Sequence, residues 1–280
     1  MIACVTPPPP IPPGPFYLPR GEHTDASGTA VGEFEATPST TGPWYADAQH
    51  MGPPSALLAR ALERLPGGAG ARIARVTVEV LGMVPAGPVT VTAQVERPGR
   101  TIELLAATMR AGGRDVLRAR AWRLAASDTA VAARETVAAL PGPDAGTVRA
   151  ERPHGWLPGF LDAVEWSWLD GVELGDLGPA RAWVRMRVPL VEGEQPAPLQ
   201  RLMVAADCAN GIAAPLDVRD WLFVNTELTV HLHRAPAGEW IGVDAATVVG
   251  PDGLGTCAAT LFDEAGHTGR IAQALTVRSR

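Results

Sequence analysis

One carboxylate stands in a helical stretch that is otherwise largely apolar. We predict a helix over residues 199–216 (LQRLMVAADCANGIAAPL), and Asp207 lies near its middle, between the apolar residues Val204 and Ala209. A carboxylate can accept the proton of a water molecule and so make that water nucleophilic. The alternative is an ordinary polar residue on an exposed helix turn. The apolar neighbours favour burial, so Asp207 is the first candidate for chemistry.

The second half of the chain repeats the plan of the first, and the two copies differ at this carboxylate. A predicted helix over residues 51–65 is followed by strand patterns, and the same order recurs around Asp207. The tripeptide Pro-Ala-Gly at residues 85–87 recurs at residues 236–238, and that offset places Ala56 opposite Asp207. The first copy therefore carries a methyl group where the second carries a carboxylate. This predicts one active centre per chain.

Other reactive residue types give weaker signals. His231 and His233 alternate along a predicted strand, but no carboxylate or third histidine accompanies them at metal-ligand spacing, so we expect a structural role and no metal site. Cys4, Cys208 and Cys257 form no Cys-x-x-Cys pair, which argues against a disulfide framework and a zinc site. The chain has no Gly-x-Ser-x-Gly elbow, dinucleotide fingerprint or P-loop. We therefore expect neither a Ser-His-Asp hydrolase nor a cofactor.

The composition narrows the class of protein further. The 280 residues are 46% hydrophobic, and 30 acidic residues exceed the 24 arginines to give a net charge of −6; lysine is absent. The arginines are interleaved with strand patterns, whereas phosphate binding needs clustered positive charge, so we expect no nucleic-acid partner. No apolar run reaches the length of about 18 residues typical of a membrane span, and the N-terminus lacks signal-peptide regions. These features predict a cytoplasmic protein with no membrane span.

The chain divides into a tail, two halves and a linker. Residues 1–15 are proline-rich and predict an extended tail, residues 16–125 form the first half, residues 126–150 lose periodicity and predict the linker, and residues 151–280 form the second half. Besides two short strands between residues 16 and 37, the predicted strands cover residues 73–80, 89–95, 102–109, 116–122, 158–171, 180–193, 222–234, 239–249, 254–262 and 268–277.

The sequence thus predicts two strands, a helix and four strands in each half. The short turns rich in Pro and Gly imply that neighbouring strands run antiparallel. One apolar helix laid across a strongly curved antiparallel sheet is the arrangement that this order favours, which is an α+β class. Two such sheets can join edge to edge, and this would also hide their edge strands from aggregation.

This plan resembles the hotdog fold, and its duplication resembles the double-hotdog acyl-CoA thioesterases of the thioesterase II type. The resemblance runs from Phe16 to Val277 and depends on the order and spacing of several motifs. These motifs are His50-Met51-Gly52-Pro53-Pro54 before the first helix, Ala205-Ala206-Asp207 and Asn210-Gly211 in the second, Asn225 to Arg234 (NTELTVHLHR), and Gly269 to Gln273 (GRIAQ).

The resemblance also implies a set of site residues. In this family three side chains orient a water at the thioester carbonyl. They are an Asp of the second helix, a hydroxyl or amide side chain at the start of the next strand, and a Gln of the last strand. The matching residues here are Asp207, Asn225 and Gln273. Thr226 is the alternative to Asn225, because neighbours on a strand point to opposite faces. A backbone N–H at a helix N-terminus would meet the oxyanion, and Gly52 is the candidate donor. His50, just before it, reads more readily as a helix-start residue than as a catalyst.

The expected activity is therefore hydrolysis of acyl-CoA, or of a related acyl thioester on a carrier protein, to a free acid and a thiol. The resemblance leaves a homo-oligomer open, because such relatives commonly assemble further, and the sequence does not fix the oligomeric state. Two other functions stay open at this point. One is a dehydratase or cyclase of polyketide assembly, although such dehydratases pair a histidine with the carboxylate and the second helix has none. The other is a module that binds acyl chains without turnover.

Overall fold

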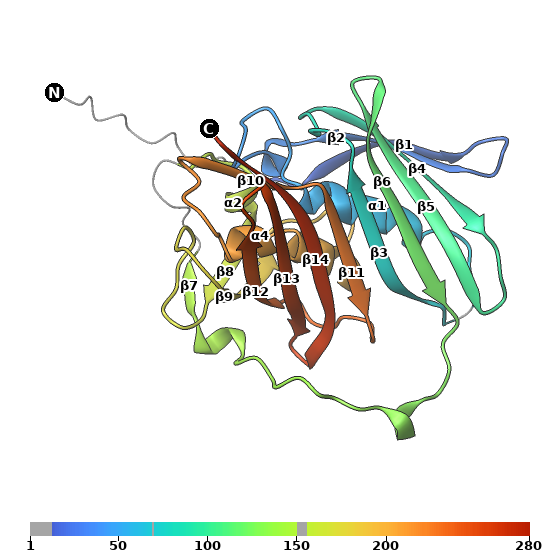
Figure 1. Cartoon of the computed structure of the whole chain (residues 1–280). Helices are drawn as coiled ribbons and strands as arrows, with labels where there is room; N and C mark the ends of the chain where they lie inside the picture. Colours follow the sequence, from blue (N-terminus) through green and yellow to red (C-terminus); the bar gives the residue numbers. More distant parts are fainter. Residues whose placement is uncertain (1–12, 69, 150–155) are drawn as a thin grey trace.

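The computed structural model describes residues 13–68, 70–149 and 156–280, which build one large antiparallel sheet with helices packed on one of its faces (Figure 1). Nearly all of the proline-rich tail lies outside the described residues. Within the described part, a sheet of fourteen strands runs in the order β1-β2-β4-β5-β6-β3-β11-β14-β13-β12-β9-β8-β7, with β10 pairing to β14 off this path. The expected α+β double-hotdog architecture is confirmed.

The N-terminal half has the predicted order of two strands, a helix and four strands. Its elements are β1 (Tyr17–Thr24), β2 (Ala30–Ala36), the short 3-10 helix η1 (Pro38–Thr40), α1 (Gly52–Glu63), β3 (Arg72–Val80), β4 (Pro88–Arg97), β5 (Ile102–Ala111) and β6 (Arg114–Leu124). The hydrophobic spacing of α1 is the reason for its placement, since Leu57, Leu58 and Leu62 are fully buried against the sheet.

The C-terminal half repeats this order with some differences. Its elements are β7 (Thr147–Arg149), α2 (Phe160–Ala163), β8 (Val164–Trp168), β9 (Ala180–Met186), α3 (Pro198–Ala206), α4 (Ala209–Ile212), β10 (Trp221–Asn225), β11 (Glu227–Leu232), β12 (Ile241–Val249), β13 (Leu254–Asp263) and β14 (Gly266–Ser279). β7 lies within the stretch expected to be the linker.

Besides the strand expected over residues 180–193, which ends early at Met186, three sequence predictions for this half were wrong in detail. Residues 158–171 do not form one strand, because Phe160–Ala163 turns as a short helix, with the Asp162 side chain accepting a hydrogen bond from the Gly159 amide at 3.0 Å. The helix expected over residues 199–216 is divided at Asp207 and Cys208 into α3 and α4. The strand expected over residues 222–234 is interrupted at Thr226. The second and third differences both shape the site described below.

The two halves share one sheet because β3 pairs with β11. Val76 lies opposite Val230 in an antiparallel register, and the Val80 amide donates to the carbonyl of Thr226 at 2.9 Å. α1 and α3 pack against each other beneath this seam. Figure 1 shows the blue and teal N-terminal elements beside the orange and red C-terminal ones. The seam covers what would otherwise be two exposed sheet edges.

A buried arginine connects α1 to both halves. The Arg60 side chain is only 2% exposed, and its guanidinium donates to Glu22 of β1 and to Glu194, which precedes α3. The two carboxylates compensate its charge, which would be costly to bury alone. The contact therefore fixes the position of α1 relative to the C-terminal half.

The linker leaves β6 on one side of the molecule and returns to β7 on the other, hanging below the sheet in Figure 1. It contains the 3-10 turns η2 (Ala130–Ala132) and η3 (Pro143–Ala145). Between them Val137 and Leu140 pack on a small apolar cluster of the C-terminal half that includes Trp183, Trp240 and Phe262. The second part of the linker is therefore docked on the outer face of the C-terminal sheet.

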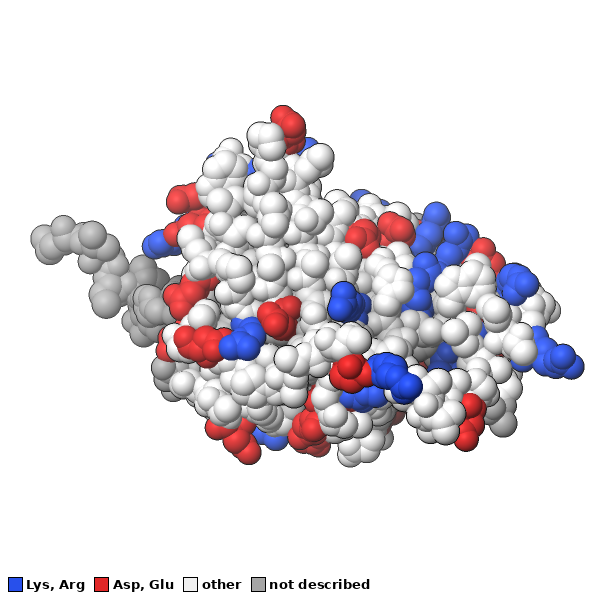
Figure 2. Space-filling view, turned by 60° about the horizontal axis from the view of Figure 1, so that its bottom comes forward, with Lys and Arg blue, Asp and Glu red and all other residues white. Residues whose placement is uncertain are grey.

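The surface carries both signs of charge. Figure 2 shows acidic and basic side chains close together on the face that it presents. On the outer face of the N-terminal strands, for example, both nitrogens of one edge of Arg120 donate to Glu96 at 2.9 Å. Within the described residues, no helix is both long enough and apolar enough to cross a membrane.

Candidate active site

A cavity of about 260 Å³ lies between the two halves and contains the candidate carboxylate. Its first-half wall comes from the segment before α1 and from the end of β3 with the loop that follows; its second-half wall comes from the junction of α3 with α4 and from the end of β10. The lining residues are Gly42, Trp44, Tyr45, Ala48, Gln49, His50, Met51, Val80, Met83, Val84, Asp207, Asn210, Val224 and Asn225. Neither half alone would form it.

Asp207 lies where the helix of the second half is interrupted. It is the residue after α3, its side chain is 4% exposed, and its carboxylate faces the cavity. The last carbonyls of a helix have no partner within the helix, so the interruption leaves the Asp207 carbonyl free to accept from elsewhere. The break thus presents both the side chain and the main chain of Asp207 to neighbouring elements.

Asn225 is the member of the predicted pair that reaches this carboxylate. It ends β10, and its Nδ2 donates to Oδ1 of Asp207 at 3.0 Å. Thr226 lies in the interruption between β10 and β11, and its hydroxyl donates instead to the carbonyl of Ala274 at 3.2 Å in a solvent-exposed hydrogen bond. Asn225 lines the cavity, whereas Thr226 does not.

Gln273 reaches Asp207 from β14, but at the main chain. Its Nε2 donates to the Asp207 carbonyl oxygen at 3.3 Å, and the residue is 1% exposed. It lies opposite the interruption at Thr226, because β11 pairs with β14 up to Ala272 and β10 pairs with it from Leu275 onward. The Gln273 Oε1 is buried and has no hydrogen-bond partner within the described residues. The three predicted residues are thus brought together, with Gln273 behind Asp207 and not among the lining residues.

His50 adds a fourth group, and it comes from the other half. Its Nδ1 lies 3.3 Å from Oδ2 of Asp207, and its ring stacks on Phe160 with centroids 3.8 Å apart and planes 2° from parallel. The sequence favoured a helix-start role, and His50 does also accept a hydrogen bond from the Gly52 amide at 3.1 Å. No local pattern could indicate the contact with Asp207, because the two residues belong to different repeats.

Gly52 is needed for close packing, and its amide is engaged. A Cβ at this position would lie 2.8 Å from the carbonyl oxygen of Val204, so the approach of α1 to α3 requires glycine. The next two positions of α1 are prolines without an N–H, and the Ser55 amide donates to Met51. A substrate oxygen could therefore use the Gly52 amide only in competition with His50.

Burial sets the charge state of the two facing groups. Desolvation raises the pKa of Asp207 to about 7, against a smaller lowering by the Asn225 hydrogen bond, and desolvation lowers the pKa of His50 to about 3. The close Nδ1 to Oδ2 approach suggests an ion pair, but an imidazole this buried stays neutral, and its Nδ1 already accepts from Gly52. The approach is therefore favourable when Asp207 carries the proton. A carboxyl that titrates near neutrality suits proton transfer at physiological pH.

The first half offers no counterpart of this carboxylate at the repeat position. Ala56 lies inside α1, fully buried among apolar side chains. Among the polar cavity residues that went unassigned at the level of sequence is Asn210, whose Nδ2 donates to the carbonyl of Phe223 at 3.0 Å and so ties α4 to β10. Its Asp-x-x-Asn spacing on the predicted helix was the signal that could have indicated it, since residues three apart share a helix face.

Comparisons with known proteins agree with this architecture. A family model described as the acyl-CoA thioesterase C-terminal domain matches residues 134–277, and one described as the acyl-CoA thioesterase N-terminal domain matches residues 40–124. A search of curated protein sequences found no match.

Solved structures with the same fold share little sequence with the chain. A protein of unknown function with a hot dog fold from Alicyclobacillus acidocaldarius superposes with a TM-score of 0.71 at 14% identity, covering 93% of this chain and 96% of that one. An acyl-CoA thioesterase II from Mycobacterium marinum superposes with a TM-score of 0.64 at 14% identity, covering 93% of this chain and 95% of that one. At such identities the likeness concerns the fold.

Proposed function

Since the chain belongs to the acyl-CoA thioesterase family, whose two domain models match residues 40–124 and 134–277, we propose that it hydrolyses acyl-CoA or a related acyl thioester to a carboxylic acid and a thiol. The observation that carries this proposal is the buried Asp207 carboxylate, which faces a cavity between the halves and is held by Asn225 at 3.0 Å. A desolvated base beside a cavity is what activation of a water requires.

In this proposal Asp207 is the general base. A water between the Asp207 carboxylate and the thioester carbonyl carbon gives a proton to Asp207 while its oxygen forms the new C–O bond. The tetrahedral intermediate then collapses, the C–S bond breaks, and the departing sulfur takes the proton from Asp207. The acid and the thiol together account for all atoms of the water and the thioester. No covalent enzyme intermediate and no cofactor is needed.

The neighbouring amides have separate tasks. Asn225 donates one N–H to Asp207, and we assign its second N–H, or the Gly52 amide once His50 releases it, to the developing oxyanion. Gln273 acts as a positioning residue, because it holds the main chain of Asp207 from behind. Its Oε1, which has no partner among the described residues, can accept a hydrogen bond from a water, and this would satisfy the buried amide oxygen.

One observation favours a second candidate function. His50 and Asp207 approach to 3.3 Å across the two halves, and such a pair can remove the α-proton and assist loss of the β-hydroxyl in the dehydration of a 3-hydroxyacyl thioester. The sequence argument against a dehydratase was that the second helix has no histidine, and here the histidine comes from the first half. Nevertheless, its Nδ1 is occupied by the Gly52 amide, and hydrolysis remains the proposal.

A single set of assays separates the two functions. The full chain is offered saturated acyl-CoAs from short to long, and free thiol is measured; in parallel, 3-hydroxyacyl-CoAs are offered and formation of the conjugated enoyl product is followed by its ultraviolet absorbance. Hydrolysis predicts thiol release that Asp207→Asn abolishes and His50→Gln only reduces. Enoyl formation without thiol release, lost equally in both variants, would overturn the hydrolase proposal in favour of the dehydratase. Binding of acyl-CoA with neither product would contradict both.

A further inference from the structure

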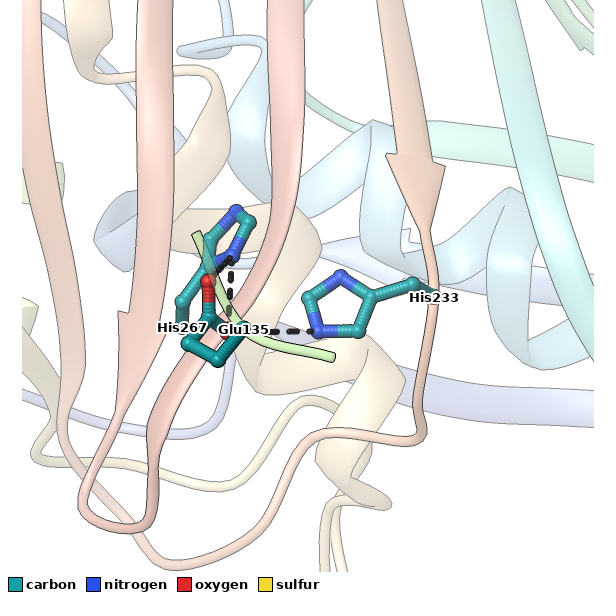
Figure 3. Close-up of side chains that lie close together, drawn as sticks. All are labelled: Glu135, His233 and His267. Carbon is teal, nitrogen blue, oxygen red and sulfur yellow. Dashed lines mark hydrogen bonds and ion pairs between the residues drawn. The ribbon is translucent and has the colours of Figure 1, made fainter. Parts of the chain in front are cut away.

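Three metal-ligand side chains that are far apart in sequence meet on the outside of the C-terminal half (Figure 3). Glu135 comes from the linker, His233 from the residue after the end of β11, and His267 from the start of β14. Their candidate ligand atoms all lie within 4.8 Å of one another. The sequence offered no carboxylate or third histidine near His233, and the fold supplies one of each.

The distances between these groups are close to those of a zinc site. Nδ1 of His267 lies 3.2 Å from each carboxylate oxygen of Glu135, and Nε2 of His233 lies 4.0 Å from Oε2. In a tetrahedral site with bonds of about 2.1 Å, ligand atoms are about 3.4 Å apart. The His267 to Glu135 contact already fits, whereas the exposed His233 ring has to move closer, because its Nε2 lies 4.0 Å from Glu135 and the candidate ligand atoms are spread over up to 4.8 Å. Two imidazoles and one carboxylate form an open set that leaves a position for water.

The two histidines stand on a rigid base. The His233 amide donates to the Thr268 carbonyl at 3.3 Å, which joins the end of β11 to β14. The guanidinium of Arg234 donates to the His267 carbonyl at 2.9 Å and to both oxygens of Asp263 at 2.5 and 2.6 Å. Asp263 compensates the positive charge of Arg234 beside the site. Ligands held on paired strands keep their spacing without the metal.

The third ligand is also held in place. One carboxylate oxygen of Glu135 accepts hydrogen bonds from the amides of Thr136 and Val137, both at 2.7 Å. The His267 side chain is 11% exposed, and its Nε2 is buried with no hydrogen-bond partner in the described part of the chain. Nδ1 of His267 therefore faces the Glu135 carboxylate, to which it can donate its proton in the metal-free protein, and binding of an ion there would release that proton.

We propose that Glu135, His233 and His267 bind one divalent transition metal ion, with Zn²⁺ as the best chemical fit, and that the ion fastens the linker to the C-terminal sheet. Two imidazoles and one carboxylate are a donor set that suits zinc. Glu135 lies where the linker, exposed from Ala126 to Arg134, meets the C-terminal half. None of the three residues lines the Asp207 cavity, so the ion has a structural role independent of the proposed hydrolysis.

The first test is metal binding by the full chain without an affinity tag. After removal of metal with EDTA, Zn²⁺ is titrated calorimetrically into the wild type and into Glu135→Gln, His233→Ala and His267→Ala. One ion per chain is expected, with affinity lowered at least tenfold in each variant, since even the loss of a residue that only supports a ligand costs about 10- to 100-fold. His231→Ala is the matched control, because it removes a histidine of β11 two residues before His233 and leaves the three ligands intact.

The second test reads out the linker itself. Trypsin cuts after arginine, and Arg134 directly precedes Glu135 in the exposed stretch. Zinc at about 100 times its Kd should slow cleavage after Arg134 by about tenfold or more in the wild type and in His231→Ala, but not in His233→Ala or His267→Ala. Each of three results would overturn the proposal. They are no zinc binding by the wild type, equal zinc binding by His231→Ala and all three ligand variants, and cleavage after Arg134 at a rate that does not depend on zinc.

Discussion

Replacement of Asp207 by Asn should abolish hydrolysis and at the same time stabilise the protein. The substitution keeps the shape of the side chain and its contacts: the amide oxygen can accept from Asn225, and the amide nitrogen can lie beside Nδ1 of His50 without the repulsion between a carboxylate and that lone pair. What it removes is a base. The loss of one general base costs about 10²–10⁴ in rate.

The gain in stability follows from the cost of burying the charge. The pKa of Asp207 rises from 3.8 to about 7 on burial, so the folded state holds a proton that the unfolded state releases in this interval. Below about pH 4 both states are protonated and the charge costs nothing; the cost then grows with pH and is complete above about pH 7. A shift of about three pKa units corresponds to about 4 kcal/mol. The Asp207→Asn variant never bears this cost, because its amide stays neutral at every pH.

The assay is thermal unfolding of wild type and variant between pH 4 and pH 8. The two proteins should melt at similar temperatures at pH 4, and the variant should melt about 10 °C higher at pH 8. Asp217→Asn is the control, since the same change of atoms is made at a surface carboxyl whose pKa Arg219 lowers to about 2. That variant should show no added stability at pH 8, where the Asp217 carboxylate is charged in both states.

Three results would refute this reasoning. A difference in melting temperature that is constant between pH 4 and pH 8 would mean that the pKa of Asp207 is not raised in the folded protein. Turnover near that of the wild type in Asp207→Asn would mean that Asp207 is not the base. From the same pKa we expect the wild-type hydrolysis rate to rise about tenfold per pH unit below pH 7 and to level above it. A flat pH–rate profile would contradict this expectation.

Three further substitutions test the neighbours of Asp207. Asn225→Ala removes the hydrogen bond that lowers the Asp207 pKa, so the pH at which the hydrolysis rate levels should move upward; an unchanged pH–rate profile would contradict that contact. Gly52→Ala places a Cβ 2.8 Å from the Val204 carbonyl and should lower the free energy of unfolding by about 1–3 kcal/mol in urea denaturation, whereas equal stability would show that α1 and α3 can separate at little cost. Gln273→Leu leaves the Asp207 carbonyl without its donor and should also lower the free energy of unfolding by about 1–3 kcal/mol. It should lower kcat with little change in KM. Loss of stability with normal kcat would show that Gln273 is purely structural.

Much of the fold was predictable because it is encoded locally. The helical spacing of Leu57, Leu58 and Leu62, the alternation along the strands and the Pro and Gly turns predicted the elements and their antiparallel order, and the repeat predicted that both halves share one plan. Asp207 could be singled out for the same reason, since a carboxylate among apolar neighbours is a local pattern. Its place opposite Ala56 followed from the repeat.

What the sequence could not indicate depends on contacts between the halves or on competition between local preferences. The apolar run around Asp207 predicts an unbroken helix, and the run around Thr226 predicts an unbroken strand; each is interrupted where packing against β14 and the neighbouring half outweighs propensity. The contact of Gln273 with the main chain of Asp207 depends on both interruptions, because the first frees the Asp207 carbonyl and the second lies opposite Gln273.

The groups that meet in space were decided by the tertiary structure alone. The sheet seam at β3 and β11 brings His50 of the first half to Asp207 of the second, and the return of the linker brings Glu135 to His233. Periodicity reports which face of an element is buried, but it carries no information on which distant element covers that face. The type and order of the elements are therefore properties of the local sequence, while the partners of each functional side chain are set by how the two halves pack.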